Sequence, residues 1–533
     1  MLTFIEKIME HRIEQIHKSA EITKEEETNT SKNADTFLIV SERYEEVLNL
    51  SREVILLYEE SKIPKTVKKM NNQLDVKMNN LFENFVIAST EIKCDDILVL
   101  AMAHINLGYI YLYKEDNLNV AKGYLIKCTE LLKGKELHYK FILTAIYAHI
   151  YLHEIWKKLQ QLENCSLQNY SLLDKALELY LSYTKEDDYP DPLNVDIFLF
   201  NKKNSKINLI NSHILTLEYM EELYCLQPTN MHKFVIYIHN LLNEQLKTIK
   251  DSTENHMFLY WAETSADLSI YFLYSNRLME AKIHIAAAEY VTVMYYISLI
   301  TDPDDAKSQE KMYNYHLVYM SINQLWAIYG IMLLRLSKEK LLQHKSNKSC
   351  EANNIESECH LKLEEEMKPL TFVDLEKDLK TIIKYHITDT YVSDLDDIKI
   401  IFANVIKLLN VVYMHFKEIN KFIPQMQIIL CMSKAYKYYV YFEGSKSKQI
   451  KVIEQQIKML DSFTNTLSSE YNALEYHYLK KLNFELAIAY STLLSLMSEE
   501  LDEIEEITDE MRNEMKQLMT IIIHYFNLLT NKS

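Results

Sequence analysis

The chain has 533 residues, of which only 5 are glycine and 7 are proline, and its formal net charge is −18. Average usage would give about 37 glycines, so the sequence excludes a β-rich or α/β fold, which needs glycine and proline at turns and phosphate loops. Hydrophobic residues make up 48% and charged residues 25% of the chain, as in folded proteins. Because single cores stop growing at about 250–300 residues, we expect two lobes or an elongated stack of helices.

The charge also limits the partners. The acidic chain lacks the basic excess that binding to nucleic acid or an anionic membrane requires, so neither is expected. Its carboxylates suit a basic protein partner, and they equally suit a large chain that needs them only for solubility.

The cysteines and the hydropathy indicate the compartment. The chain has 7 cysteines and no CxxC pair, which is typical of thiols in a reducing environment. The first residues, MLTFIEKIMEHRIEQIHKSAEI, are charged and amphipathic, unlike a signal peptide. The most apolar stretch, residues 322–336, is shorter than the about 20 residues that span a bilayer. We therefore expect a cytoplasmic protein without membrane insertion.

In chain order, the sequence predicts N-terminal helices over residues 1–95 and a lobe of helical hairpins over 96–300. The first hairpin, at 101–132, follows the frame of a tetratricopeptide (TPR) unit, in which small residues let two antiparallel helices approach closely. Its frame residues are Leu107, Gly108 and Tyr111 in the first helix and Ala121, Leu125 and Cys128 in the second.

Weaker hairpins follow this unit. Residues 141–159 pair with 170–183, and residues 210–226 pair with 231–247. Residues 182–206 contain two of the 7 prolines and are predicted to form a loop.

The strongest frame is in YWAETSADLSIYFLYSNRLMEAKIHIAAAEYV, residues 260–291. Leu268 and Phe272 stand at first-helix positions, and Ala281, Ile285 and Ala288 stand at second-helix positions beyond the polar break SNR. The spacing predicts two tightly packed helices. A hairpin in an ordinary helical bundle is the alternative. A stack of such units would form a right-handed α-solenoid with a concave groove.

Polar segments divide the rest of the chain. Residues 301–311 are predicted to break the stack, so that a C-terminal lobe covers 312–533 and begins with a long helix around 313–336. Residues 337–369 lack apolar periodicity and are predicted to be a flexible insertion. A late hairpin is predicted at 470–497.

No motif for chemistry is present. The sequence has no GxGxxG, Walker loop, HExxH or GxSxG. Cys350, Cys359 and His360 have a spacing that suits no common zinc module. We therefore expect no cofactor, no metal and no enzymatic activity, although a pocket of converging titratable groups would indicate an enzyme.

The 38 tyrosines have two interpretations. Tyrosine fills wedge-shaped gaps between stacked helices while its hydroxyl reaches the surface. Tyrosines that line a groove would instead be anchors for a protein partner.

Several stretches together resemble the kinesin-binding protein family. They are NEQLK followed by residues 260–291, KVIEQQIKMLDSF (451–463) followed by residues 470–494, LGYIYLYKEDNLNVAKGYLIKCTELL (107–132) and YTKEDDYPDPLN (183–194). The resemblance covers about residues 95 to 500. It implies a non-enzymatic α-solenoid of two TPR-like lobes in the cytoplasm, associated with the cytoskeleton.

The resemblance also implies a partner. Members of this family bind the motor domains of some kinesins on the face that grips the microtubule, so that the motor cannot attach to its track. Roles in axon growth and in the positioning of mitochondria and vesicles follow, and further cytoskeletal components are possible partners. An acidic groove would compete for that basic face by charge complementarity.

Carried over to this sequence, the motor-facing residues are Tyr219, Glu222, Gln245, Asp267 and Ile270. Gln245 lies in a matching EQL, whereas Glu222 replaces an amide and Asp267 and Ile270 replace uncharged polar residues. The alternative for each is an exposed helical residue without a partner. For the whole chain, the alternative is a generic TPR scaffold or co-chaperone adaptor that binds a peptide, although the clamp residues for a terminal carboxylate are absent.

Overall fold

The computed structural model describes residues 1, 3–10, 13–14, 38–59, 64–87, 92–163, 170–186, 188–193, 205–251, 256–301, 308–347, 369–386, 394–466, 472–501 and 508–530. Its regular elements are helices, and no strand occurs in these residues. Most helices that follow one another in sequence pack against each other, and first helices of neighbouring hairpins are also in contact. The predicted all-α solenoid of TPR-like hairpins is therefore confirmed.

By its packing, the chain divides into two compact units, Met1–Tyr237 and Ile238–Ser533. The division lies within α9 (His232–Asp251). It differs from the break expected at residues 301–311, where α11 ends at Thr301 and α12 begins at Ser308. Residues 302–307 lie outside the described part of the chain.

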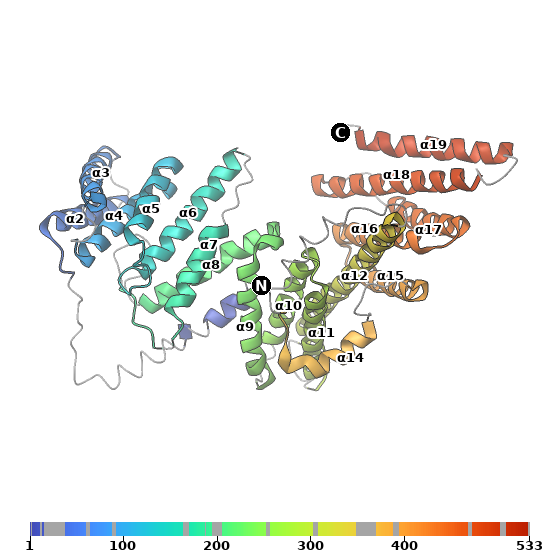
Figure 1. Cartoon of the computed structure of the whole chain (residues 1–533), viewed down its shortest axis with the longest axis horizontal. Helices are drawn as coiled ribbons and strands as arrows, with labels where there is room; N and C mark the ends of the chain where they lie inside the picture. Colours follow the sequence, from blue (N-terminus) through green and yellow to red (C-terminus); the bar gives the residue numbers. More distant parts are fainter. Residues whose placement is uncertain are drawn as a thin grey trace. The chain divides into compact units, whose positions relative to one another are not determined.

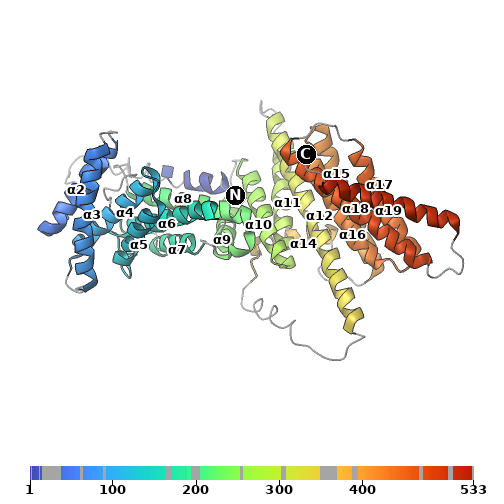
Figure 2. The same cartoon turned by 90° about the horizontal axis from the view of Figure 1, so that it is seen from above.

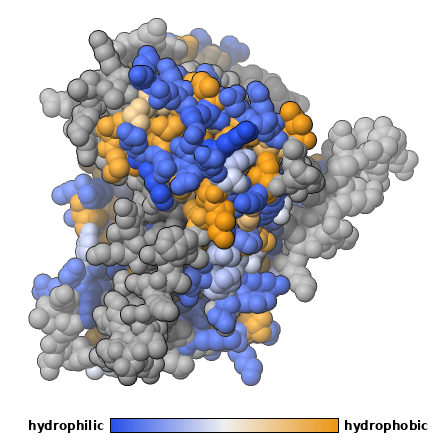
Figure 3. Space-filling view, turned by 90° about the vertical axis from the view of Figure 1, so that its left-hand side faces the viewer, coloured by the Kyte–Doolittle hydropathy of each residue, from blue (hydrophilic) through white to orange (hydrophobic). Residues whose placement is uncertain are grey.

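Unit 1 is a row of antiparallel helices (Figures 1 and 2). Its core is continuous from α2 to α8, because each helix buries its apolar face on the next. Seen from its N-terminal end, the surface mixes hydrophilic side chains with apolar ones (Figure 3). Leu56 of α2 and Val76 and Val86 of α3 are exposed. The helices are α2 (Glu42–Glu59), α3 (Pro64–Ile87), α4 (Cys94–Tyr113), α5 (Leu118–Leu132), α6 (Ile142–Glu163), α7 (Tyr170–Tyr183) and α8 (Ser205–Leu226).

The α4–α5 hairpin shows why small residues matter. A Cβ atom built on Gly108 of α4 would lie 2.7 Å from Cδ2 of Leu125 on α5, which is closer than van der Waals contact. The turn contains Asp116 in the left-handed region (φ 48°), followed by Asn117, whose side chain accepts a hydrogen bond from the Val120 amide and caps α5.

Unit 2 continues with longer helices. Its α10 and α11 form the predicted hairpin of residues 260–291, and Leu268, Phe272, Ala281, Ile285 and Ala288 are fully buried. The helices are α10 (His256–Tyr274), α11 (Leu278–Thr301), α12 (Ser308–Asn347), α14 (Glu376–His386), α15 (Leu395–Glu418), α16 (Phe422–Tyr439), α17 (Lys446–Thr464), α18 (Ala473–Leu501) and α19 (Asp509–Thr530), with the 3-10 turns η2 (Val373–Leu375) and η3 (Val440–Phe442).

The SNR break between α10 and α11 is a helix-ending turn. Asn276 adopts a left-handed conformation (φ 57°) and the Arg277 amide donates to the Phe272 carbonyl at 2.8 Å. Asparagine tolerates this conformation better than most residues, so it replaces the glycine common after a helix.

Two predictions require correction. The hairpin expected at 470–497 is wrong, because α18 is one continuous helix that pairs with α19. The middle of that stretch, around Leu482 and Asn483, contains no glycine or proline that would end a helix, and both residues are buried. Likewise, α12 continues to Asn347, so the first part of the expected insertion 337–369 is helical. Residues 348–368, which include Cys350, Cys359 and His360, lie outside the described residues.

Four helical segments, from α4, α11, α12 and α15, are long and apolar enough to cross a membrane by length and composition. The expectation that no stretch reaches this length is therefore wrong for α12, whose apolar segment extends beyond residues 322–336 to Gln309–Gln343. Burial explains this hydropathy best in α4 and less well in α11 and α15, whose apolar windows are 44% and 28% buried, since a helix packed on several sides needs apolar residues around its circumference. In α4, 83% of the apolar window is buried within the protein.

Candidate partner-binding surface

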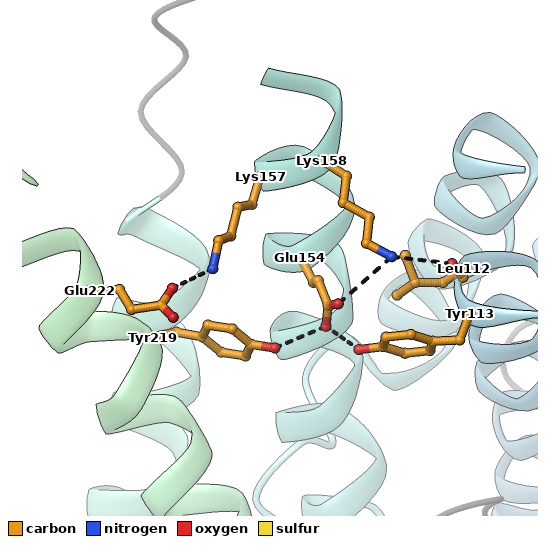
Figure 4. A network of polar contacts seen from close by, with 7 residues as sticks. All are labelled: Leu112, Tyr113, Glu154, Lys157, Lys158, Tyr219 and Glu222. Carbon is orange, nitrogen blue, oxygen red and sulfur yellow. Dashed lines mark hydrogen bonds and ion pairs between the residues drawn. The ribbon is translucent and has the colours of Figure 1, made fainter. Parts of the chain in front are cut away.

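A polar network joins three first helices of unit 1 (Figure 4). The carboxylate of Glu154 on α6 accepts a hydrogen bond from the hydroxyl of Tyr113 on α4. It also accepts one of 2.9 Å from the hydroxyl of Tyr219 on α8. One carboxylate therefore ties together α4, α6 and α8, whose side chains lie on the same face of the repeat stack.

Two lysines of α6 extend this network. Lys157 forms an ion pair with Glu222 of α8, and its ammonium lies 5.2 Å from the centre of the Tyr219 ring. Lys158 lies 3.9 Å from Glu154 and donates to the Leu112 carbonyl at 3.4 Å. Because the side chain of Glu222 is 55% exposed, its ion pair is solvent-screened and contributes little to stability.

The environment keeps both tyrosines neutral. Burial raises the pKa of Tyr113 well above its usual value, and its hydrogen bond to Glu154 adds to the effect. Burial also raises the pKa of Tyr219, and the negative charge of Glu154 raises it further. Both hydroxyls therefore remain hydrogen-bond donors at neutral pH, so the surface keeps its geometry.

The surface of α8 next to this network is acidic. Glu218, Glu221 and Glu222 lie within five residues of one another. Burial raises the pKa of Glu218, and the charges of Glu6 and Glu222 raise it further. Carboxylates that destabilise one another in this way would be stabilised by a cationic partner.

Unit 2 carries the other predicted residues. Glu263, Asp267 and Ile270 are spaced four and three residues apart on α10, so they share one face of that helix. Loss of solvent raises the pKa of Glu263, and the charge of Asp267 raises it further. Asp267 and Ile270 are half-buried, and so is Gln245 on α9.

The predicted site residues thus form two groups. Tyr219 and Glu222 lie together on α8 in unit 1, and Asp267 and Ile270 lie together on α10 in unit 2. Gln245 lies on α9, the helix that precedes α10. Their role in binding stays a prediction.

Sequence reasoning missed Tyr113, Glu154 and Lys157. Glu154 lies within HEIW, which resembles half of a zinc motif rather than a binding surface. The signal that could have found it is positional, because Tyr113, Glu154 and Tyr219 fall in the C-terminal halves of three successive first helices.

A second polar group lies in unit 2. Asp461 of α17 accepts hydrogen bonds from Tyr490 of α18 at 2.6 Å and from Tyr525 of α19 at 2.8 Å, beside an open groove of about 480 Å³. These bonds tie three consecutive helices, whereas the Glu154 network of unit 1 ties the alternate helices α4, α6 and α8. Within the described residues, no group of three or more histidine, cysteine or acidic side chains is placed to hold a metal ion.

Fold and surface together define a helical-repeat binding protein, whose first helices present polar and aromatic side chains held in place by hydrogen bonds. Comparison with known families shows to which family of proteins the chain belongs. The family described as "KIF-1 binding protein C terminal" matches residues 259–532, more than half of the chain. The chain belongs to the KIF-1 binding protein family, as the resemblance in its sequence indicates.

Curated relatives agree with this assignment. The KIF-binding protein of Gallus gallus is 22% identical over 425 residues, which cover 78% of this chain and 69% of the relative. The Homo sapiens KIF-binding protein is 22% identical over 454 residues, with 80% and 69% covered. That of Drosophila melanogaster is 23% identical over 230 residues, with 43% and 37% covered.

Proposed function

We propose that this protein binds kinesin motor domains through the inner helices of its repeats. The observation that carries this proposal is the α8 surface, where three carboxylates adjoin a tyrosine fixed by hydrogen bonds to α6. Membership of a family whose curated relatives are named KIF-binding proteins supports kinesins as the partner.

The face that a kinesin presents to the microtubule is basic, because tubulin is acidic. The carboxylates of α8 and α10 would attract that face, and Tyr219, Gln245 and Ile270 would supply shape-specific contacts. A motor held in this way cannot bind tubulin with the same face. The protein would thus be a stoichiometric inhibitor that regulates microtubule-based transport, and its place of action would be the cytoplasm.

Binding measured by isothermal titration with a purified motor domain tests the charge complementarity. The double reversal Glu222→Lys and Asp267→Lys is expected to weaken binding at least tenfold. The matched control Glu310→Lys and Asp509→Lys changes the net charge equally, at exposed positions on α12 and α19, and is expected to weaken binding much less.

Ionic strength separates surface attraction from other causes. Screening of exposed charges should weaken binding of the wild-type protein as salt increases, and the site double reversal should reduce this salt dependence. If both double variants lost the same amount of affinity for the motor domain, the proposed surface would be contradicted. If several kinesins show no binding to the wild-type protein, the partner is wrong, and a generic peptide-binding scaffold becomes the better interpretation.

A further inference from the structure

A short helix near the N-terminus has an apolar face that is already covered. Residues 3–10 are helical, and Phe4, Ile5 and Met9 are at most 1% exposed, while Ile8 is 6% exposed. Their spacing places these four side chains on one face of the helix. On the other face, Lys7 forms an exposed ion pair with Glu10. An isolated helix of this length is not stable in water, so its contacts hold it in place.

Two observations place this helix at α8. The N-terminal ammonium lies 3.4 Å from a carboxylate oxygen of Glu221, and the side chain of Met1 is 2% exposed. Glu6 is close enough to Glu218 for its charge to raise the pKa of that carboxyl group. Figure 2 shows the N-terminal helix alongside α8. The contacted carboxylates flank Tyr219 and Glu222, so the helix lies beside the surface described above.

We propose that Met1 and the helix of residues 3–10 are an internal competitor that covers the acidic surface of α8, and that a bound partner displaces them. The ammonium group occupies the position that a basic side chain of the partner would take. The buried side chains of residues 3–10 are not part of the core that runs from α2 to α8, so release of the helix would leave that core in place. This inference rests on the proposed function, since it describes how the same site is regulated.

Hydrogen exchange in the intact 533-residue chain tests, without any partner, whether the helix of residues 3–10 covers α8. In the double variant Phe4→Asp and Met9→Asp, amides of residues 3–10 and of α8 should exchange faster than in the wild type. The control Glu10→Ala changes only the exposed face, where the side chain of Glu10 is 60% exposed, and should leave both segments protected. Circular dichroism should show that the helical content of all three proteins is nearly the same. Unchanged exchange of α8 in the double variant would overturn the proposal.

Addition of a motor domain tests the competition. Residues 3–10 should lose protection while α8 keeps it, and the double variant should bind the motor more tightly. If the helix covers α8 in about 90% of molecules, its release raises the affinity about tenfold. Protection of residues 3–10 that persists in the complex, or equal affinities, would contradict competition. If no motor binds either form, the proposed function fails, whereas the exchange result without motor still decides whether the helix covers α8.

Discussion

Tyr219 on α8 donates a hydrogen bond of 2.9 Å to Glu154 on α6, and the same carboxylate accepts a hydrogen bond from Tyr113 on α4. A tyrosine expected to face a partner is thus also a structural tie between repeats. The two interpretations of the tyrosines are therefore compatible, because a hydroxyl that fixes one helix against the next also fixes the ring at the surface.

Removal of the Tyr219 hydroxyl should loosen this tie. Tyr219→Phe leaves Glu154 with one tyrosine donor and Lys158, and hydrogen bonds to charged groups contribute about 1.5–3 kcal/mol. We expect the free energy of unfolding to fall by about 1.5 kcal/mol, measured by urea denaturation. Tyr274, which is 67% exposed on α10, provides the control, and Tyr274→Phe should have almost no effect. Equal effects of the two variants would contradict a structural role for the bond.

Alanine substitutions at the two glycines of the α4–α5 hairpin should have opposite effects on stability. Gly108→Ala places a Cβ against buried Leu125, and overpacking of about 1–3 kcal/mol outweighs the helix-propensity gain of about 1 kcal/mol. A Cβ on Gly123 of α5 would meet nothing within 4 Å, so Gly123→Ala should stabilise the protein. Thermal unfolding of both variants checks this. Stabilisation by both would show that the helices separate readily.

His104 on α4 should make the protein sensitive to acid. It is fully buried between the rings of Phe82 and Tyr124, and neither ring nitrogen has a hydrogen-bond partner among the described residues. Burial lowers its pKa to about 3, and the nearby charge of Lys127 contributes. The folded state therefore stays neutral while the unfolded state gains a proton as the pH falls below about 6.5. Stability from this residue is complete above that pH and is lost towards pH 3.

His104→Leu removes this linkage and an unsatisfied polar group. We expect the variant to be more stable at pH 7 by about 1 kcal/mol. Its advantage should grow by about 2 kcal/mol between pH 7 and pH 5, because only the wild-type unfolded state gains that proton. Urea denaturation at both pH values measures the difference. A constant difference would mean that the imidazole takes up its proton over the same pH range in the folded state as in the unfolded state.

Phe372 anchors the segment that leads into η2 and α14. The centre of its ring lies 4.9 Å from the ring centres of His239 and His284 and 5.3 Å from that of Trp261. Phe372 is 1% exposed. Phe372→Ala should lower the stability of unit 2 by about 3 kcal/mol and increase hydrogen exchange in α14. The neighbouring Val373 is 74% exposed, so Val373→Ala should change neither quantity. Normal protection of α14 in Phe372→Ala would show that other contacts hold it.

The sequence predicted the parts of the fold that depend on local spacing. Leu268, Phe272 and Ala281 are buried in one hairpin because a repeat imposes residue size at fixed positions. The same reasoning failed at α18, where apolar residues on several sides of one long helix imitate two helices. The polar residues SNR predicted the break between α10 and α11, but they could not predict the left-handed conformation of Asn276.

The candidate surface was only partly predictable. Tyr219 and Glu222 follow from the family resemblance, which aligns single positions. The roles of Tyr113, Glu154 and Lys157 depend on contacts between helices about 40 to 65 residues apart. Such pairs leave no periodic signal in one sequence, because each residue alone is an ordinary polar residue on a helix.

Microtubule co-sedimentation of a purified kinesin motor domain of the vesicle-transport class, with increasing amounts of this protein, tests the proposed inhibition most directly. We predict that the motor leaves the pellet stoichiometrically, that Glu222→Lys with Asp267→Lys restores it to the pellet, and that the double control at Glu310 and Asp509 does not. A motor that stays on microtubules at saturating amounts of the wild-type protein, or that sediments together with it, would contradict inhibition through the microtubule-binding face.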